Sequence, residues 1–261
     1  MPLIDANGIR LHYRIDGPED GRPLLLSNSL ASNLHMWDPQ IADLTAAGLR
    51  VIRYDSRGHG GSDAPEGPYS IEMLAEDAVA LLDGLGVVRA DFCGLSKGGM
   101  VGQMLGVRHA NRVSKLILAD TGAYMPTKEM WDGRIKTVEK GGMEAVADAT
   151  LERWFTPASH QSRPGDLEKV REMILGTPPQ GFIGCCRAIQ AMDQRGSIGA
   201  ITTPTLVLVG AEDPATTPDH AKEIHGLIKG SSYVEIPAAA HFANFEQPEL
   251  FTKAMLEFLG A

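Results

Sequence analysis

The amino-acid sequence predicts one α/β domain built on a mostly parallel sheet that is flanked by helices and carries a helical insertion. Short β-rich segments alternate with helical segments along most of the 261 residues, which is typical of a parallel sheet covered by helices. Several β-rich segments are almost continuously apolar, as expected for strands buried on both faces of a sheet. The alternation stops between residues 122 and 198, where amphipathic helical segments follow one another without a strand.

Seven segments have the composition and length of strands. The first, residues 9–15 (IRLHYRI), alternates apolar and polar side chains and suits an outer, antiparallel strand. The other six cover residues 23–28, 49–54, 90–94, 113–119, 204–210 and 232–237. Two helices are predicted between them: residues 70–86, with a serine as N-cap and a glycine as stop, and residues 97–110.

Residues 122–198 form the insertion, so the sheet-bearing core comprises residues 1–121 and 199–261. The insertion follows the end of a predicted strand. At that place it would lie over the carboxyl-terminal edge of the sheet, where open α/β sheets bind their ligands. We therefore interpret it as a helical cap, or lid, over a binding site. A structural elaboration that only protects the edge of the sheet is the alternative.

Composition argues against several classes of function. The formal net charge of −9 argues against a nucleic-acid partner, because phosphate contacts need a basic face. The first residues lack a signal-peptide pattern, and no apolar run approaches the length of a membrane span, so we expect a cytoplasmic protein with no membrane partner. Cys93, Cys185 and Cys186 do not make a disulfide framework. No metal-ligand cluster or phosphate-binding loop occurs in the sequence, so neither a metal nor another cofactor is expected.

One serine lies in a turn that favours nucleophilic catalysis. The segment GLSKGG fits the pattern G-x-S-x-G with Gly94, Ser96 and Gly98, and it joins a predicted strand to a predicted helix. A sharp strand-to-helix turn strains the serine backbone, and side chains at the two glycine positions would collide with the turn. The hydroxyl then lies at a helix N-terminus, where a developing negative charge is stabilised. The alternative is a glycine-rich turn with an incidental serine.

A serine needs a base that is held by an acid before it becomes an effective nucleophile. At a turn of this kind the acid and then the histidine come from later strand ends. The loop after the next-to-last predicted strand supplies two adjacent acids, Glu212 and Asp213, and the loop after the last one supplies His241. Its position after the last strand distinguishes His241 from the other histidines of the chain.

An oxyanion intermediate needs two hydrogen-bond donors. We expect one from the backbone N–H of Lys97, the residue after the serine. We expect the other from the backbone N–H of Ser29, in the loop after the second predicted strand.

These motifs, together with three further segments, resemble those of α/β-hydrolases that carry a helical cap. The three segments are MWDPQIADL, YDSRGHGGSD and HFANFEQPE. Within that superfamily the chain resembles the 3-oxoadipate enol-lactonases of the β-ketoadipate pathway, through the segments HYRIDG, LLLSNSL, RYDSRGHGGSDAPEGPYSIEML, FCGLSKGGM and RWFTP. These lactonases share the SNSL segment, which stands where a His-Gly pair is common in the superfamily.

The resemblance implies an eight-stranded α/β-hydrolase sheet, a catalytic triad of Ser96, Asp213 and His241, and no cofactor. Asp213 is preferred to Glu212 because G-x-x-D is the usual spacing after this strand in the family. The implied activity is that of a carboxylic ester hydrolase: His241 takes the proton of Ser96, an acyl-enzyme forms, and water releases the acid. The implied partner is a small-molecule substrate, a lactone or an ester, with 3-oxoadipate enol-lactone as the first choice.

Lys97 departs from the family, whose members usually have methionine or another apolar residue after the nucleophile. A cation in the first turn of a helix is disfavoured by the helix dipole, by a few tenths to about 1 kcal/mol. One hypothesis is that Lys97 reaches into the pocket and binds a substrate carboxylate. The other is that its ammonium pairs with an acid such as Asp120 or Glu246, or reaches solvent.

The cap supplies the other candidates for the substrate pocket. Trp154, in RWFTP, would line the pocket or belong to the interior of the cap. Arg134, Arg153, Arg187 and Arg195 are four cations of this region, and one of them could bind a carboxylate through two hydrogen bonds while the others are solvated.

A carboxylesterase of broad substrate range shares this mechanism and is the nearest alternative. Carbon–carbon bond hydrolases and cofactor-free perhydrolases of the same fold would use the same triad. A hydrolase-fold receptor that binds a ligand without useful turnover is the alternative from a different class of function. Exposed apolar surface on the cap would also allow a homo-oligomer.

Overall fold

Eight strands form one sheet in the computed structural model, which describes residues 2–261, and their spatial order is β1-β2-β4-β3-β5-β6-β7-β8. Their bounds are β1 (Leu3–Ala6), β2 (Ile9–Asp16), β3 (Arg22–Ser27), β4 (Leu49–Tyr54), β5 (Ala90–Leu95), β6 (Val113–Ala119), β7 (Thr205–Gly210) and β8 (Ser232–Ile236). β2 pairs antiparallel with β1 and with β4, and the other neighbouring strands pair parallel. The predicted eight-stranded, mostly parallel sheet is confirmed, and β1 is the strand that the seven β-rich segments did not include.

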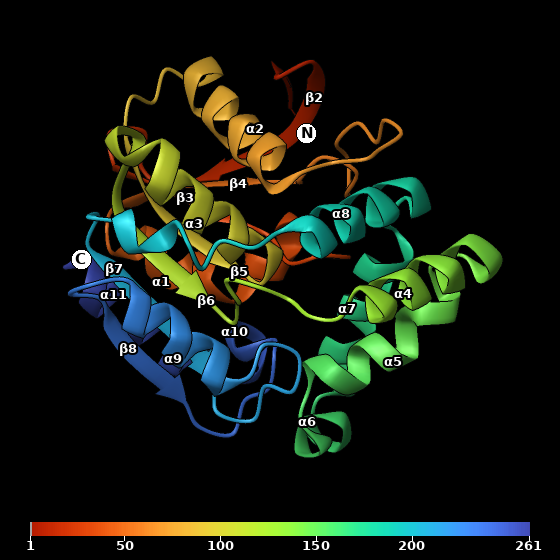
Figure 1. Cartoon of the computed structure of the whole chain (residues 1–261). Coiled ribbons are helices and arrows are strands. Elements are labelled where there is room, and N and C mark those ends of the chain that lie inside the picture. Colours follow the sequence, from red (N-terminus) through yellow and green to blue (C-terminus); the bar gives the residue numbers. More distant parts are fainter. Residues whose placement is uncertain (1) are drawn as a thin grey trace.

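Helices cover both faces of the sheet, and a separate group of helices lies to one side of it (Figure 1). The core helices are η1 (Leu34–Trp37), α1 (Asp38–Ala46), α2 (Ile71–Gly84), α3 (Lys97–Arg108), η2 (Ala110–Arg112), η3 (Ile198–Ala200), α9 (Pro218–Leu227), α10 (Ala243–Glu246) and α11 (Pro248–Leu259). No helix within residues 2–261 has both the length and the apolar character needed to cross a membrane.

The separate group, which we call the cap, comprises the helices between β6 and β7. They are α4 (Lys128–Gly141), α5 (Glu144–Trp154), α6 (Pro157–Ser162), α7 (Pro164–Leu175) and α8 (Pro179–Ala191). α4 packs on α5 and α8, and α5 packs on α7. Their facing sides bury apolar residues that include Trp131, Ile135, Val170, Ile174 and Phe182. An isolated antiparallel bridge between Tyr124 and Asp193 joins the two chain segments that lead into and out of the cap.

Local signals in the sequence set the first core helix. The hydroxyl of Ser70 accepts a hydrogen bond from the backbone N–H of Met73 and so caps α2. Gly86 follows the helix in a left-handed conformation, with φ of 68°, which stops it. The observed helix therefore begins one residue later and ends two residues earlier than the predicted range 70–86.

The order of the strands places a crevice at the carboxyl ends of β3 and β5. β4 and β5 lie on opposite sides of β3, so the direction in which strands are added reverses at β3. In open α/β sheets the ligand crevice forms outside the strand ends at such a point. The loop after β3 carries Ser29 and the turn after β5 carries Ser96, so both predicted site segments lie at this crevice.

The contact between α3 and β3 gives a first prediction. A Cβ atom added at Gly98 would lie 2.1 Å from the backbone oxygen of Ser27, and a backbone atom cannot move away as a side chain can. We expect Gly98→Ala to lower the free energy of unfolding by at least about 2–3 kcal/mol, measured by urea unfolding followed by circular dichroism.

Gly133→Ala is the matched control, because Gly133 lies within α4 and a Cβ there meets nothing within 4 Å. The control should raise the free energy of unfolding by about 0.5–1 kcal/mol through helix propensity alone. A Gly98→Ala protein as stable as the parent would contradict the close approach of α3 to β3.

Candidate active site

Ser96 occupies a strained turn between β5 and α3. Its backbone has φ of 58° and ψ of −115°, which lies outside the regions that L-residues favour. The Ser96 N–H donates to the carbonyl of Ala119, and the Ser96 carbonyl accepts from the hydroxyl of Thr121. A Cβ atom on Gly94 would lie 2.1 Å from the carbonyl oxygen of Gly98, so the glycines of the G-x-S-x-G pattern are sterically required. The sequence interpretation of this turn therefore matches its geometry.

Asp213 and His241 meet at the carboxyl ends of the last two strands. Nδ1 of His241 lies 2.8 Å from Oδ2 of Asp213, and both side chains are buried. Asp213 also accepts hydrogen bonds from the backbone N–H groups of Ala215 and Thr216 and from the hydroxyl of Thr216. Burial alone would raise the pKa of Asp213, but His241 and these hydrogen bonds lower it below its ordinary value. An ionised Asp213 selects the tautomer with the proton on Nδ1 and leaves the lone pair on Nε2.

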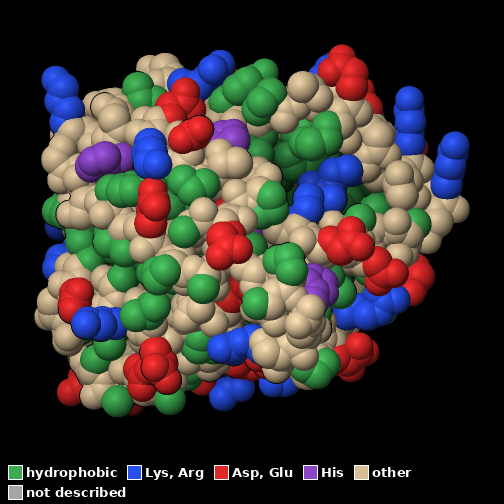
Figure 2. Space-filling view, turned by 90° about the horizontal axis from the view of Figure 1, so that it is seen from below, with side chains coloured by type: hydrophobic (Ala, Val, Ile, Leu, Met, Phe, Trp, Pro, Cys, Tyr) green, Lys and Arg blue, Asp and Glu red, His purple; other side chains and the backbone are tan. Residues whose placement is uncertain are grey.

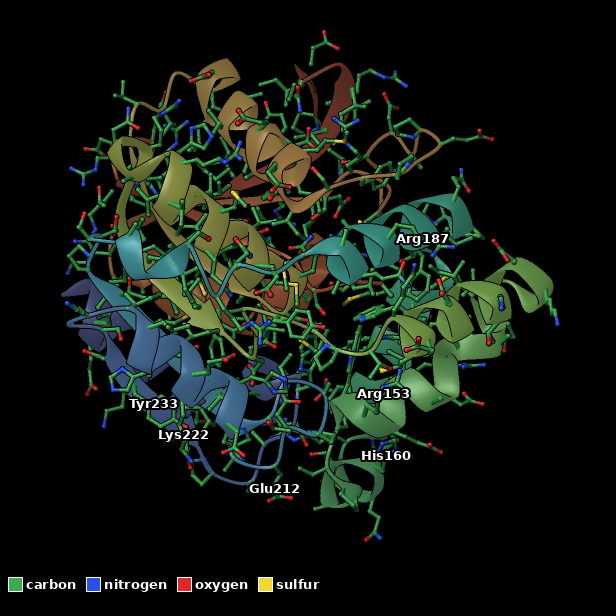
Figure 3. The ribbon with its side chains drawn as sticks, viewed as in Figure 1. Arg153, His160, Arg187, Glu212, Lys222 and Tyr233 are labelled. Carbon is green, nitrogen blue, oxygen red and sulfur yellow. The ribbon has the colours of Figure 1, made fainter. Side chains whose placement is uncertain are left out.

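Glu212, the alternative acid, lies elsewhere. Its side chain is exposed, and Figure 3 shows it at the periphery of the molecule. The backbone of the loop explains the difference, because the N–H of Asp213 donates to the carbonyl of Gly210 and turns the Asp213 side chain inward. Only Asp213 of the two adjacent acids contacts His241 among the described residues.

Ser96, Ser29 and His241 line one cavity of about 140 Å³ between the core and the cap. Figure 2 shows a hollow on the face of the molecule where the core meets the cap, with Lys or Arg side chains at its edge. The other residues around the cavity are Leu30, Met100, Met125, Met130, Trp131, Arg134, Arg153, Trp154, Ile189, Pro214, Ala215 and Thr216. A larger groove of about 530 Å³ lies elsewhere, along α7 and the start of α1, and includes none of the three predicted triad residues.

The two predicted oxyanion donors lie at the crevice. The N–H of Lys97 belongs to the first turn of α3, where helix N–H groups have no partner within the helix. The N–H of Ser29 points at the thioether sulfur of Met36, 3.2 Å away. Because a thioether is a weak acceptor, an oxyanion would compete for this N–H effectively. The buried hydroxyl of Ser29 has no hydrogen-bond partner within residues 2–261, so it is an additional donor beside the cavity.

The Lys97 side chain differs from both sequence hypotheses. It is fully buried, it is not among the residues that line the cavity, and its Nζ has no hydrogen-bond partner in the described part of the chain. It therefore neither reaches the substrate pocket nor pairs with Asp120 or Glu246 nor reaches solvent. Burial lowers the pKa of Lys97, although Cys185 and two acids of the core act in the opposite direction.

A buried histidine responds to the same lysine. Burial, followed by the charge of Lys97, holds the pKa of His59 well below its ordinary value. The Nε2 atom of His59 accepts a hydrogen bond from the N–H of Ala31, which requires the unprotonated nitrogen. His59 therefore stays neutral beside the buried amine of Lys97.

Two arginines of the cap line the cavity. Arg134 and Arg153 form no ion pair within residues 2–261, and the guanidinium of Arg134 lies over the ring of Trp131, with 5.1 Å from Cζ to the ring centroid. Burial lowers the pKa of both arginines, and that of Arg153 falls to about 10 with Arg134 as a further cause. Arg187, on α8 in Figure 3, instead pairs with Asp132.

Arg195 is likewise paired, with Asp193. Of the four arginines considered from the sequence, the structure thus brings two to the cavity and leaves the other two in ion pairs outside it. The ring of Trp154 lines the cavity, which is one of the two roles considered for it, and it stacks on Phe242 of the core with 4.1 Å between the ring centroids.

Three residues near the triad were not identified as site residues from the sequence. Thr216 donates to Asp213, and its hydroxyl lies 3.1 Å from Nδ1 of His241. Asp120 is buried at the end of β6 and accepts a hydrogen bond from the N–H of Gly210, and its pKa lies well above its ordinary value because of burial and the nearby Asp213. Glu246 accepts a hydrogen bond from the N–H of Ala240. Of these three residues, only Thr216 could have been found from the sequence, because it follows Asp213 by three residues, a spacing that is typical of a carboxylate-capped turn.

The fold and the site define a hydrolase of the α/β type, and comparison with known proteins agrees. The profile of the α/β-hydrolase fold family matches residues 22–153, and the chain belongs to this family. It is 37% identical to 3-oxoadipate enol-lactonase 2 of Acinetobacter baylyi, over 97% of this chain and 94% of that protein. The crystal structure of the enol-lactonase from Burkholderia xenovorans LB400 matches with a TM-score of 0.97 and 42% identity over the whole of both chains.

A thermophilic esterase from Thermogutta terrifontis, in a malate-bound structure, matches with a TM-score of 0.93 and 30% identity, over 99% of this chain and 98% of that one. The protein is therefore an α/β-fold hydrolase that is similar to enol-lactonases over its full described length. The resemblance found in the sequence motifs is confirmed at the level of the family.

The buried Lys97 gives a prediction about stability. In the unfolded chain Lys97 titrates near 10.5, whereas its pKa in the folded chain is lower. Between these two pKa values the unfolded chain binds more protons, so the stability of the parent rises as the pH rises through this window. We expect Lys97→Met to raise the free energy of unfolding at neutral pH by about 1–3 kcal/mol and to remove this rise.

Urea unfolding at several pH values from neutral to 10.5 measures both effects. Lys253→Met is the control, because the side chain of Lys253 is 70% exposed and its removal should leave the pH dependence unchanged. A Lys97→Met protein that is less stable than the parent at every pH would show that Lys97 is charged and stabilised in the folded chain.

Proposed function

We propose that the protein is a serine hydrolase that opens a small anionic lactone, 3-oxoadipate enol-lactone, to 3-oxoadipate through an acyl-enzyme on Ser96. The observation that carries this proposal is that His241, which is hydrogen-bonded to Asp213, lines the same cavity as the strained Ser96. The similarity to an enol-lactonase of 42% identity supports the choice of substrate.

The chemistry follows from the positions of these groups. Nε2 of His241 accepts the proton of Ser96 as the serine oxygen attacks the lactone carbonyl. The backbone N–H groups of Ser29 and Lys97 stabilise the oxyanion. The ring C–O bond then breaks, the leaving enol oxygen takes the proton from His241, and the enol becomes a ketone. A water molecule, deprotonated by His241, then attacks the acyl-enzyme. The bond between the acyl carbon and the Ser96 oxygen breaks, Ser96 takes the proton back from His241, and the second carboxylate is released.

Asp213 stabilises the imidazolium that forms in each step. Its four hydrogen bonds keep it ionised, so the positive charge on His241 always has a buried counter-charge. Asp120, whose pKa is raised, serves best as a neutral carboxylic acid that holds Gly210 at the end of β7.

The charge of the cavity favours an anionic substrate. Arg134 and Arg153 are partly buried, and neither has a carboxylate partner within residues 2–261. Taking a cation out of water without a partner costs free energy, and a substrate carboxylate would offset this cost by binding one or both guanidinium groups. 3-Oxoadipate enol-lactone carries such a carboxylate, whereas a neutral ester does not.

A carboxylesterase of broad range is the second candidate, and the likeness to the Thermogutta terrifontis esterase favours it. Initial rates with 3-oxoadipate enol-lactone and with a neutral aryl acetate separate the two. The lactonase should have a much higher kcat/KM for the lactone, whereas a broad esterase should hydrolyse both at similar rates.

Ser96→Ala tests the covalent route. The variant should lose at least about a thousandfold in kcat for the lactone, because no acyl-enzyme can form, while it keeps the fold and the cavity. Mass spectrometry of the parent after rapid quenching should detect the acyl group on Ser96. Hydrolysis by the variant at a rate near that of the parent would contradict the mechanism, and a single burst without turnover in the parent would favour a ligand receptor.

The arginine pair gives a test of substrate charge. Arg134→Met and Arg153→Met should each raise KM for the enol-lactone by about tenfold or more, because a charged hydrogen bond is lost, and should change KM for the aryl acetate little. Arg187→Met is the matched control, since its side chain pairs with Asp132 outside the cavity. If Arg134→Met and Arg153→Met changed KM equally for both substrates, the proposed role of the two arginines in anion binding would be wrong.

A further inference from the structure

The loop that carries His241 is fastened to the cap on both sides of the histidine. The backbone N–H of Ala240, the residue before it, donates to Oε2 of Glu246 at 2.6 Å. The backbone N–H of Phe242, the residue after it, donates to the carbonyl of Trp154 at 2.9 Å. Trp154 is the last residue of α5, so the second bond already joins this loop to the cap.

Glu246 makes the first bond part of the same connection. Its other oxygen, Oε1, accepts hydrogen bonds from the backbone N–H of Thr156 at 2.8 Å and from the hydroxyl of Thr156 at 2.7 Å. Thr156 lies in the cap, between α5 and α6, and caps the N-terminus of α6. One carboxylate from the core thus holds both the residue before the base and the junction of two cap helices.

This connection is well shielded from water. Only 1% of the surface of Glu246 is exposed, and Ala240 and Thr156 are buried as well. The ring stack of Trp154 on Phe242, with an angle of 11° between the ring planes, packs beside it. In Figure 1 the α5–α6 junction lies next to the loop between β8 and α10, in agreement with these contacts. A hydrogen bond lost in such a place would leave a buried N–H group without a partner.

We propose that Glu246 is a positioning residue for the reaction: it fixes the His241 loop to the cap at Thr156, so that the base is aligned only while the α5–α6 junction of the cap is in place. Glu246 touches neither the substrate nor the reacting atoms, and it acts through Ala240 and the backbone of the loop. The inference rests on the proposed function, because it assigns His241 the role of the base.

The neighbouring charges are consistent with this role. Glu246 lies close enough to Asp120 to contribute to the raised pKa of that carboxyl group, after burial and Asp213. Asp213 and Glu246 therefore both bond to the His241 loop, and a change in the hydrogen bonds of either would shift the position of the loop relative to Ser96. Displacement of a catalytic group by about 1 Å can lower the rate of the chemical step by about a hundredfold.

Glu246→Gln is the first test, because the amide keeps the size of the side chain. One end of the amide can still accept from Thr156, but its NH₂ group then faces the N–H of Ala240, donor against donor. We expect kcat for a neutral aryl acetate to fall between about tenfold and a hundredfold with KM nearly unchanged. An aryl acetate is used because it does not depend on the cap arginines.

Thr156 provides a test from the cap side with a matched control. Thr156→Val removes the hydroxyl that donates to Glu246. Like Glu246→Gln, this substitution should lower kcat, although Thr156 does not line the cavity. Thr156→Ser keeps both donors and the helix cap, and its kcat should stay close to that of the parent. The rate constant for labelling of Ser96 by a fluorophosphonate should follow kcat across the series.

The extent of labelling separates alignment from folding. If Glu246→Gln and Thr156→Val label completely but slowly, the substitutions affect the alignment of the base, as proposed. If kcat and the labelling rate are unchanged while only the melting temperature falls, or if kcat falls only in proportion to the labelled fraction, Glu246 is structural and the proposal is overturned. A parent protein that does not label at Ser96 would instead refute the proposed function itself.

Discussion

The backbone of the Ser96 turn is the constraint on which the rest of the site depends. Two hydrogen bonds hold its strained φ and ψ angles. The N–H of Ser96 donates to the carbonyl of Ala119 at the end of β6, and the hydroxyl of Thr121, two residues further on, donates to the carbonyl of Ser96. Gly94 and Gly98 allow β5, α3 and β3 to approach to distances that no Cβ atom would permit. Because the sheet and α3 fix the nucleophile, the adjustable parts of the site are the two loops that bring the acid and the base to it.

Three buried carboxyl groups at the ends of the last strands differ in the donors that surround them. Asp213 accepts three hydrogen bonds in addition to that of His241, and its pKa is lowered although burial opposes this. Asp120 accepts one, from Gly210, and its pKa is raised by burial and further by the nearby Asp213 and Glu246. The difference matters for catalysis, because a second carboxylate beside Asp213 would stabilise the imidazolium further and make His241 slower to return its proton. Burial raises the pKa of both acids, and His241 together with the hydrogen-bond donors around Asp213 outweighs it at Asp213 only.

The sequence was enough to predict that Ser96, Asp213 and His241 lie close together, because a parallel sheet brings the carboxyl ends of its strands to one edge. The position of each residue relative to its strand therefore predicts which edge of the sheet it occupies. The sequence could not give the direction of the Lys97 side chain, which depends on the space beside His59 and Cys185, both distant in the sequence. For the same reason the sequence could not show that Arg153 lines the cavity whereas Arg187 does not. Each lies on an amphipathic cap helix, and only the packing of the cap on the core shows which one faces the cavity and which one meets an acid. Contacts between distant segments, rather than local patterns, determined what was missed.

The cap combines two tasks within four consecutive residues. Arg153 supplies positive charge to the cavity, Trp154 forms part of its wall and binds the His241 loop, and Thr156 holds Glu246. The net charge of −9 does not prevent the binding of an anion, since charges further than a Debye length of about 8 Å are largely screened at physiological ionic strength. The local field in the cavity therefore comes mainly from the two arginines. If this short segment both recognises the substrate charge and aligns the base, as we propose, a displacement of the cap would weaken both together. A substrate that holds the cap through its carboxylate would then also favour the aligned base.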